Sequence, residues 1–286
     1  MKALIVNADD FGISREVNAA VIKTHRDGIL TSASLMVAEA HAEEAARLAR
    51  ENPDLDVGLH AVVCKGHSVR RAAELGGLVD EQGRFPENPV VAGMRWYFDK
   101  QLRAKLETEL RAQVERHLEL VGYLNHIDGH LNFHVHPVVA DVLVALAVEY
   151  KVPCLRLPRE RALTTLRLRR DNAARKVVEA VIFRTLSRRT SGMMRKHGLK
   201  STNALFGLHQ SGHLDEDYIA AIIDRLRNGT TELYFHPAMD IGETPPSPAA
   251  QLEVEILTSP RIRDSLTARG VTLTNFAKLV RANGTP

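Results

Sequence analysis

The chain has 286 residues, of which 44% are hydrophobic and 26% charged, and its formal net charge is +3. This composition is typical of a globular protein with a sizeable core, and so small a net charge does not by itself indicate a nucleic-acid partner. No apolar run reaches the roughly 18 residues of a membrane span, and the start MKALIVNADD does not resemble a signal peptide. We therefore expect a cytoplasmic protein in which Cys64 and Cys154 are reduced and at least partly buried.

Strands and helices are predicted to alternate along the chain. Apolar and β-branched stretches indicate strands at 2–8, 29–37, 56–63, 152–158, 231–237 and 270–276. Helical patterns occur at 15–28, 42–50, 99–121 and 138–150, with Ser14 suited to cap the first helix. This alternation is typical of parallel βαβ units. Because no glycine-rich nucleotide fingerprint follows the first strand, we predict an α/β fold of the irregular (β/α) TIM-like barrel type rather than an open doubly wound sheet.

We expect residues 1–286 to form a single catalytic domain with two insertions. The first, at 64–99, lacks a regular pattern and is predicted to be a loop or lid. Within it, Trp96 is a candidate for stacking on a bound ligand, and packing of the lid against the barrel is an equal alternative.

The second insertion, at 159–200, is predicted to be helical and strongly basic. It holds thirteen Lys or Arg residues against three Asp or Glu residues, together with the apolar stretch VVEAVIF. A solvated surface helix is one interpretation. Peripheral contact with a membrane, with basic side chains on anionic headgroups, is the functional alternative. Nucleic-acid binding is disfavoured, because Phe183 is the only aromatic residue in the segment.

Ionisable side chains follow several of the predicted strands, where parallel α/β folds place their active sites. They are Asp9, Asp10, His60, His126, Asp128, His130, Arg156 and His236. Four of the thirteen histidines fall within positions 126–136, a density that favours metal binding over isolated structural roles. Not all four can be ligands, and His136 precedes Pro137, so it is suited to cap the next helix.

Adjacent residues on a strand face opposite sides, so Asp9 and Asp10 can converge only if the strand is interrupted there. Phe11 and Gly12 are expected to end it. A capping or turn pair is the alternative, and His60 taken alone would also suit a satisfied core position. One aspartate with two histidines makes an open metal site with room for water, and a neighbouring carboxylate can take the proton of that water. The residues present therefore suggest metal-assisted hydrolysis.

Four stretches of the sequence resemble the YdjC-like carbohydrate deacetylases, a family that includes chitooligosaccharide deacetylases. They are NADDFG at 7–12, GLH at 58–60, HIDGHLNFHVHP at 126–137 and FHPAMD at 235–240. The resemblance implies an irregular (β/α) barrel of the glycoside hydrolase and deacetylase type. It also implies removal of an N-acetyl group from an amino sugar with one divalent metal ion, zinc or magnesium, and a possible homodimer.

Carried over position by position, the resemblance implies Asp10, His60 and His130 as metal ligands and Asp9 as the general base. His236 is the candidate acid or transition-state stabiliser. Asp128 is expected to orient a ligand histidine, and Arg156 to hold the base or a sugar hydroxyl. His134 and Asp240 are further candidates for substrate binding or for supporting the ligands.

A narrower resemblance, to the hopanoid-biosynthesis-associated branch, lies in GMRWYFDKQLRAKLETELRAQ, HLNFHVHP and LRLPRE. It implies an N-acetylglucosaminyl lipid as the substrate and association with the inner face of the membrane. The alternatives are a chitooligosaccharide deacetylase, a metal-dependent phosphoesterase and a non-catalytic glycolipid-binding protein.

Overall fold

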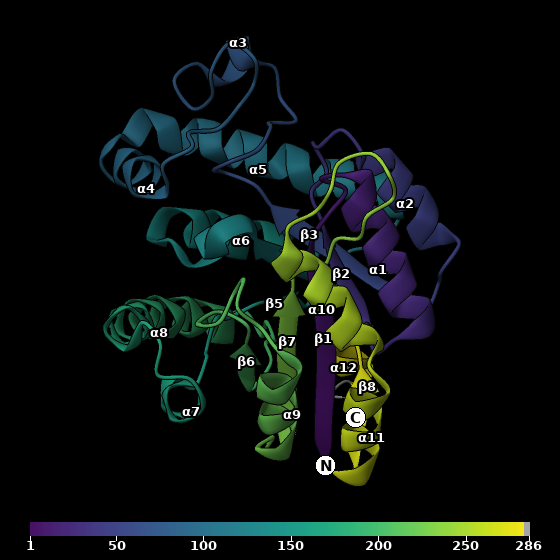
Figure 1. Ribbon diagram of the computed structural model, residues 1–286. Coiled ribbons are helices and arrows are strands. Elements are labelled where there is room, and N and C mark those ends of the chain that lie inside the picture. The colour runs from purple at the N-terminus through teal and green to yellow at the C-terminus, as the bar shows by residue number, and fades with distance from the viewer. Residues whose placement is uncertain (283–286) are drawn as a thin grey trace.

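The computed structural model describes residues 1–282 and contains one curled sheet of parallel strands with helices on its outside (Figure 1). The strand order in the sheet is β5-β4-β3-β2-β1-β7-β6, and β8 pairs with the amino-terminal half of β1. The strands are β1 Lys2–Phe11, β2 Ser32–Leu35, β3 Asp56–Ala61, β4 His126–Gly129, β5 Cys154–Leu155, β6 Ala204–Phe206, β7 Gly229–Phe235 and β8 Val271–Thr274. The α/β class and the parallel strands predicted from the sequence are therefore confirmed.

Helices connect the strands and cover the outer face of the sheet. They are α1 Arg15–Asp27, α2 Ala42–Arg50, α3 Ala72–Leu75, α4 Pro89–Phe98, α5 Lys100–Val121, α6 Pro137–Glu149, α7 Ala162–Leu168, α8 Ala173–Lys196, α9 Glu216–Asp224, α10 Pro248–Thr258, α11 Pro260–Ala268 and α12 Phe276–Ala282. A 3₁₀ helix, η1, spans His130–Val135. Among the described residues, no helix has the length and apolar character needed to cross a membrane.

Side chains alternate between the two faces of the curled sheet. On β1, Leu4, Val6 and Ala8 belong to the large apolar cluster under the helices. Asn7 and Asp9 lie on the opposite, inner face and are both buried. The strands β2, β3, β4 and β7 also alternate polar and apolar side chains, so much of the inner face is polar while the outer face forms the hydrophobic core.

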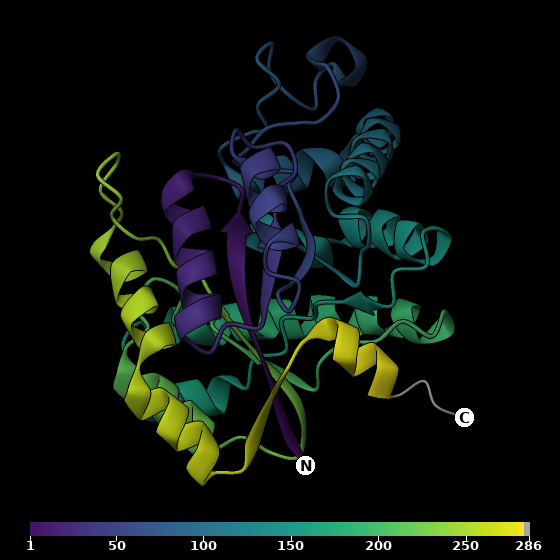
Figure 2. The same cartoon turned by 90° about the vertical axis from the view of Figure 1, so that its right-hand side faces the viewer.

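The amino-terminal end of this interior is closed by α12. Its Phe276 packs with Ile5 and Cys154 and stacks on His126 at a ring-centroid distance of 3.9 Å. Figure 2 shows α12, in yellow, in the lower half of the molecule, just after β8. With that end plugged, a substrate reaches the interior polar groups from the carboxyl ends of the strands.

The predicted barrel is only partly realised, because the sheet is a curled half-barrel. The edge strands β5 and β6 have two and three residues, and no ladder joins them. In the described part of the chain, these two sides are linked by two isolated bridges, Cys154 to Lys200 and Glu160 to Leu205, and not by a continuous ladder. Strands this short offer too few backbone groups for a continuous closing ladder.

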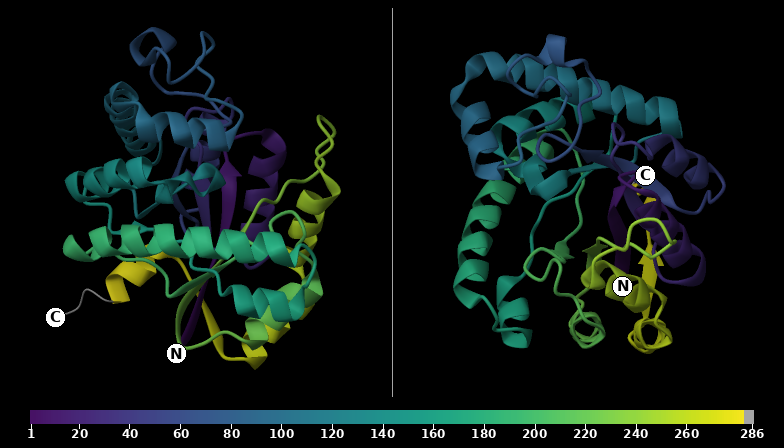
Figure 3. Two further views of the ribbon diagram at one scale, coloured as in Figure 1. Left: turned by 90° about the vertical axis from the view of Figure 1, so that its left-hand side faces the viewer. Right: turned by 45° about the horizontal axis from the view of Figure 1, so that its top comes forward.

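The two predicted insertions are both partly helical. Residues 64–99 contain α3 and α4 and lie above the carboxyl ends of the strands in Figure 1. Backbone amides of Val69 and Arg70 donate to the Glu109 carboxylate at 2.8 and 2.9 Å, which ties this segment to α5. Residues 159–200 form α7 and α8, and the long α8 lies across the outside of the molecule (Figure 3, left).

Candidate metal centre and active site

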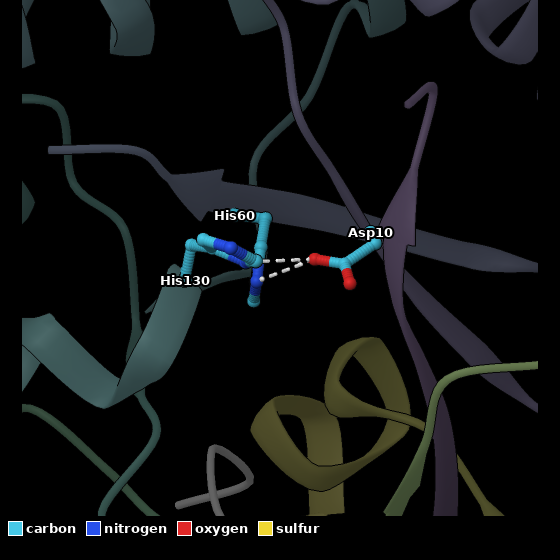
Figure 4. Close-up of side chains that lie close together, drawn as sticks. All are labelled: Asp10, His60 and His130. Carbon is cyan, nitrogen blue, oxygen red and sulfur yellow. Dashed lines mark hydrogen bonds and ion pairs between the residues drawn. The ribbon is translucent and has the colours of Figure 1, made fainter. Parts of the chain in front are cut away.

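Asp10, His60 and His130 converge at the carboxyl ends of β1, β3 and β4 (Figure 4). One carboxylate oxygen of Asp10 lies 2.9 Å from His130 Nδ1 and 3.3 Å from His60 Nε2. The three donor atoms are within 4.8 Å of one another. One carboxylate and two imidazoles around a common point are a donor set that suits a divalent transition metal and leaves positions for water.

Asp10 reaches this position through a local distortion of β1. Its φ is 63°, and the register of β1 against β2 shifts between Ala8 and Phe11. The strand ends at Phe11, as expected, and Gly12 follows with a φ of 94°. The two aspartates converge because of a distortion at Asp10, within the strand, which was not predicted from the sequence. A bulge at Asp10 lets its side chain turn toward the open end of the sheet interior, at the carboxyl ends of the strands, which we call the mouth; Asp9 faces the same mouth. Leu131 and Asn132, directly after His130, also have left-handed backbones, so strained conformations gather around the ligands.

Asp128 holds the His60 nitrogen that faces away from Asp10. This nitrogen, Nδ1, lies 2.6 Å from Asp128 Oδ1, so Nε2 faces Asp10. Burial opposes the charged imidazole, but Asp128, Asp9 and Asp10 together raise the pKa of His60 to about 10. A carboxylate that fixes the ring orientation of a ligand histidine is a recurring feature of metal sites, and the contact expected for Asp128 is present.

Arg156 connects the acidic side chains inside the sheet. It binds both oxygens of Asp9, at 2.7 and 2.8 Å, and also contacts Asp128 and Glu232 at 2.8 Å each. The Arg156 guanidinium also lies over the ring of Tyr234, 4.9 Å from its centroid. Of the two partners expected for Arg156, the candidate base is the one it contacts. Without this guanidinium, three buried carboxylates would lie close together without compensation.

A carboxylate oxygen of Asp9 also lies within 4.8 Å of a His60 nitrogen, in a group with Asp128. Both carboxylates of this second group are already paired with Arg156. The group containing Asp10 is therefore the better metal centre, with Asp9 beside it.

Three residues of the inner network were missed from the sequence: Asn7, Ser34 and Glu232. Asn7 Nδ2 donates to Asp9 at 2.8 Å, and the Ser34 hydroxyl donates to Asp128 at 2.7 Å. Burial is the main reason that the pKa of Glu232 rises to about 7, even though Arg156 opposes the rise. Their signal in the sequence is a polar residue at every second position of an apolar strand, as in SASL and TELYF.

Gly58, in the GLH motif, is needed for the placement of His126. A side chain at position 58 would put its Cβ about 2.3 Å from the His126 ring. His126 is fully buried and stacks on Phe276, so it supports the interior and stays out of the metal group.

His134 and His236 flank the centre without joining the metal group. His134 is buried, its Nε2 has no partner among the described residues, and burial lowers its pKa to about 4. His236 follows β7, and since Ala8 pairs with Phe235, it lies beside Asp9 across the sheet. Its backbone amide donates to the buried Glu253 carboxylate, and its half-buried ring makes no hydrogen bond with the described residues.

Two expected site residues lie elsewhere. Trp96 is 1% exposed and packs edge-on against Phe133 at 5.1 Å, so it anchors the lid and offers no face to a sugar. Asp240 is exposed and accepts a hydrogen bond from the Gly242 amide within a turn. It has no contact with the metal group among the described residues. Sequence position alone could not separate these residues from those facing the interior.

The comparisons with known proteins agree with this architecture. The chain is 32% identical to a carbohydrate deacetylase of Geobacillus stearothermophilus over 97% of its own length and 98% of the relative's. It is 28% identical to a carbohydrate deacetylase of Thermoanaerobacter pseudethanolicus, over 98% of this chain and all of the relative.

Among solved structures, a putative cellobiose-phosphate cleavage protein of Enterococcus faecalis matches with a TM-score of 0.75 and 23% identity. The match covers 97% of this chain and 98% of that one, and it supports the fold. The family model of the YdjC-like proteins matches residues 3–268. The chain therefore belongs to the YdjC-like protein family.

Proposed function

We propose that this protein is a metal-dependent hydrolase that removes the N-acetyl group from an N-acetylated amino sugar. The observation that carries the proposal is the Asp10, His60 and His130 group with the Arg156-held carboxylate of Asp9 next to it. The names of the relatives, which are carbohydrate deacetylases, support the choice of substrate class. The reaction consumes one water and yields acetate and a free amine.

The ligands would be Asp10, His60 and His130, and a divalent cation bound by them would polarise the acetamide carbonyl and a water molecule. Asp9 accepts the proton from the attacking water. Arg156 donates to both Asp9 oxygens, and Asn7 Nδ2 donates to Oδ1 as well. Oδ2 therefore keeps a free lone pair, so the carboxylate stays charged, oriented and able to accept a proton.

Asp128 keeps the ring of His60 oriented through its bond to Nδ1. His236 is the candidate donor of a proton to the departing amine nitrogen, since its ring is half-buried, unpaired and beside Asp9 in the sheet. Glu253, which accepts from the His236 backbone amide, fixes the position of this residue.

The finer proposal is that the sugar is carried on a lipid, as in an N-acetylglucosaminyl hopanoid. A shallow depression of about 380 Å³ lies between α4 and η1, lined by Val90, Met94, Tyr97, Phe98 and Phe133. Phe133 follows His130 by three residues on η1. An apolar surface this close to the metal centre suits a hydrophobic aglycone. Basic and apolar side chains of α7 and α8 would place the enzyme at the cytoplasmic face of a membrane.

The test is acetate release from an N-acetylglucosaminyl lipid and from diacetylchitobiose, before and after removal of metal with a chelator. We expect turnover that is lost with the chelator and restored by zinc, magnesium, manganese, cobalt or nickel. Faster release from chitobiose would assign a soluble oligosaccharide. Hydrolysis of phosphate esters without acetate release would indicate a phosphoesterase. Binding of the glycolipid with no acetate released under any metal would indicate a non-catalytic protein.

A further inference from the structure

A cavity of about 1020 Å³ lies between α7, α8 and the residues that follow β6. None of the metal-centre residues lines it, so it is separate from the site described above. One wall is shared with that site, because Phe183 of α8 lines the cavity and packs against the cluster containing Tyr234. Tyr234 in turn lies under the Arg156 guanidinium.

The lining of this cavity is strongly basic. Seven arginines contribute to it: Arg159, Arg161, Arg167, Arg184, Arg188, Arg195 and Arg227. The only acid is Glu160, whose carboxylate already accepts from the Thr165 hydroxyl and from the amides of Leu208 and His209. The Glu160 carboxylate is therefore held by these three donors, and it makes no ion pair with an arginine among the described residues.

The side chains of these seven arginines make no hydrogen bond or ion pair with any described residue. Other arginines of the same segment do pair: Arg169 with Asp215, Arg175 with Glu179 and Arg189 with Asp141, each at 2.7 Å. Arginines of this segment that lie near an acidic side chain form ion pairs with it, whereas the arginines around the cavity have no such partner among the described residues.

The unpaired arginines also repel one another. Burial and the neighbouring Arg195 lower the pKa of Arg159, and burial and Arg227 lower that of Arg161. Repulsion between like charges is unfavourable, and an anion bound between them relieves it. A cavity with arginine pairs on its walls is therefore suited to bind an anion.

Two buried polar atoms on the cavity wall have no partner in the described part of the chain. They are the hydroxyl of Ser187, 1% exposed, and Nε2 of His209, 3% exposed. Buried polar atoms are rarely left unsatisfied, so these two point to a ligand. The Ser187 hydroxyl can donate to an anionic oxygen alongside the guanidinium groups.

Exposed apolar side chains lie on the cavity wall or next to its lining residues in the chain, and we call them its apolar rim. Leu163 lines the cavity and is 72% exposed, and Val177, Val178 and Val181 are exposed along the first half of α8. These valines lie about one turn before the lining residues Ala180 and Arg184. Figure 1 shows α7 and α8 side by side on one flank of the molecule. An arginine-lined cavity with an apolar rim matches an amphiphile whose polar end is an anion.

We propose that this cavity is a binding site for the phosphate group of a membrane phospholipid, with α7 and the start of α8 resting in the lipid interface. Guanidinium forks bind phosphate oxygens in pairs, which the unpaired arginines are free to do. The volume exceeds that of a single phosphate, and the exposed valines would enter the headgroup boundary. The inference stands apart from the proposed deacetylation, because neither the reaction nor the metal is needed for it.

The experiment measures binding of the whole chain to vesicles of phosphatidylcholine with or without phosphatidic acid, by co-sedimentation. We expect binding only with phosphatidic acid, and we expect inorganic pyrophosphate to compete for the site. If pyrophosphate binds but vesicles do not, the cavity binds phosphate groups, and the proposal that the phosphate belongs to a lipid is overturned. If neither probe binds, the proposal is overturned.

The decisive comparison uses two double variants of α8 with equal loss of charge. Arg184→Gln with Arg188→Gln removes two cavity arginines, and Arg175→Gln with Arg189→Gln removes two outside it. We expect the first to weaken binding about 100-fold, at roughly tenfold per guanidinium, and the second to weaken it little. Equal weakening would show diffuse attraction between charges and overturn the site.

A third variant, Ala180→Trp, fills the cavity while every charge is kept. Binding should be lost even though the helix and its arginines remain. Unchanged binding would overturn the proposal. Circular dichroism and thermal melting of each variant establish that the fold is intact.

Discussion

Arg156 and Asp9 form a two-pronged ion pair inside the curled sheet, with Nη1 and Nη2 at 2.7 and 2.8 Å from the two carboxylate oxygens. Both side chains are nearly inaccessible, at 1% and 3% exposed. The residues are 147 positions apart, and the pair exists only because β5 curls round to face β1. It fixes the candidate base in place and compensates its charge.

Replacement of Arg156 with lysine should impair both stability and turnover. Lysine keeps the charge but cannot hold Asp9 bidentately while also reaching Asp128 and Glu232. We expect the free energy of unfolding to fall by about 3 kcal/mol, as for a broken buried ion pair. Urea unfolding measures this. The matched variant Arg111→Lys, at the exposed pair with Glu149, should change stability much less, and equal losses would contradict the role given to the interior network.

Asp9→Asn should abolish acetate release while metal stays bound. The amide cannot accept the water proton, and its amino group would face the Arg156 guanidinium. A fall in kcat of about 10² to 10⁴ is expected for the loss of a general base. Steady-state kinetics with metal analysis of the same sample tests this. Near-normal turnover by the variant would remove Asp9 from the mechanism.

His60→Ala should lower the metal content of the protein, because it deletes one of three donors and leaves Asp128 without its imidazole partner. Removal of a ligand or of its supporting partner typically costs about 10- to 100-fold or more in metal affinity. Metal stoichiometry after dialysis against a limiting chelator is the measurement. His213→Ala, an exposed histidine outside the group, is the control, and an unchanged metal content in His60→Ala would exclude that ligand.

Acid should destabilise the protein through buried neutral histidines remote from solvent. Burial lowers the pKa of His117 to about 3, whereas a histidine in the unfolded chain titrates near 6.5. Between these values the unfolded state binds more protons than the folded state. The contribution of the buried neutral histidine to the free energy of unfolding is therefore fully present above about pH 6.5 and is lost as the pH falls. The expected slope is at most about 1.4 kcal/mol per pH unit for each such histidine.

Urea unfolding at pH 7 and pH 5 measures this decline. His117→Gln should reduce the difference between the two pH values, since glutamine does not titrate there. The exposed His213→Gln should leave the difference as in the parent protein. A difference unaffected by His117→Gln would show that other groups account for the acid sensitivity.

Much of the fold follows from local patterns. The helix at 42–50 has the bounds expected from its sequence, and those at 15–28, 99–121 and 138–150 agree within a residue at each end. These helices have strong periodicity or clear signals such as Ser14 and Pro137, which act through neighbours in the chain. The strands β4 and β6 were not predicted, because four and three residues are too few to show a period.

The extent of sheet closure was beyond the sequence. Alternating strands and helices are equally consistent with a complete barrel, and the difference lies in how β5 and β6 meet. That contact joins segments far apart in the chain, so no local pattern encodes it. The same applies to Trp96, which proves to be a buried anchor only because η1 presents Phe133 to it.

The sequence by itself placed Asp9, Asp10, His60, Arg156 and His236 in or next to predicted strands, since residue type and apolar runs mark those points along the chain. It marked His130 only by the density of histidines at 126–136. Only the tertiary structure decided which of them share one mouth. The left-handed bulge at Asp10 turns two neighbouring aspartates toward one site, and the curl of the sheet brings Arg156 to Asp9. The tertiary structure also brings seven arginines together around one cavity, because α7 and α8 pack against each other on one flank. These arginines have no partner among the described residues, and no sequence pattern specifies this arrangement.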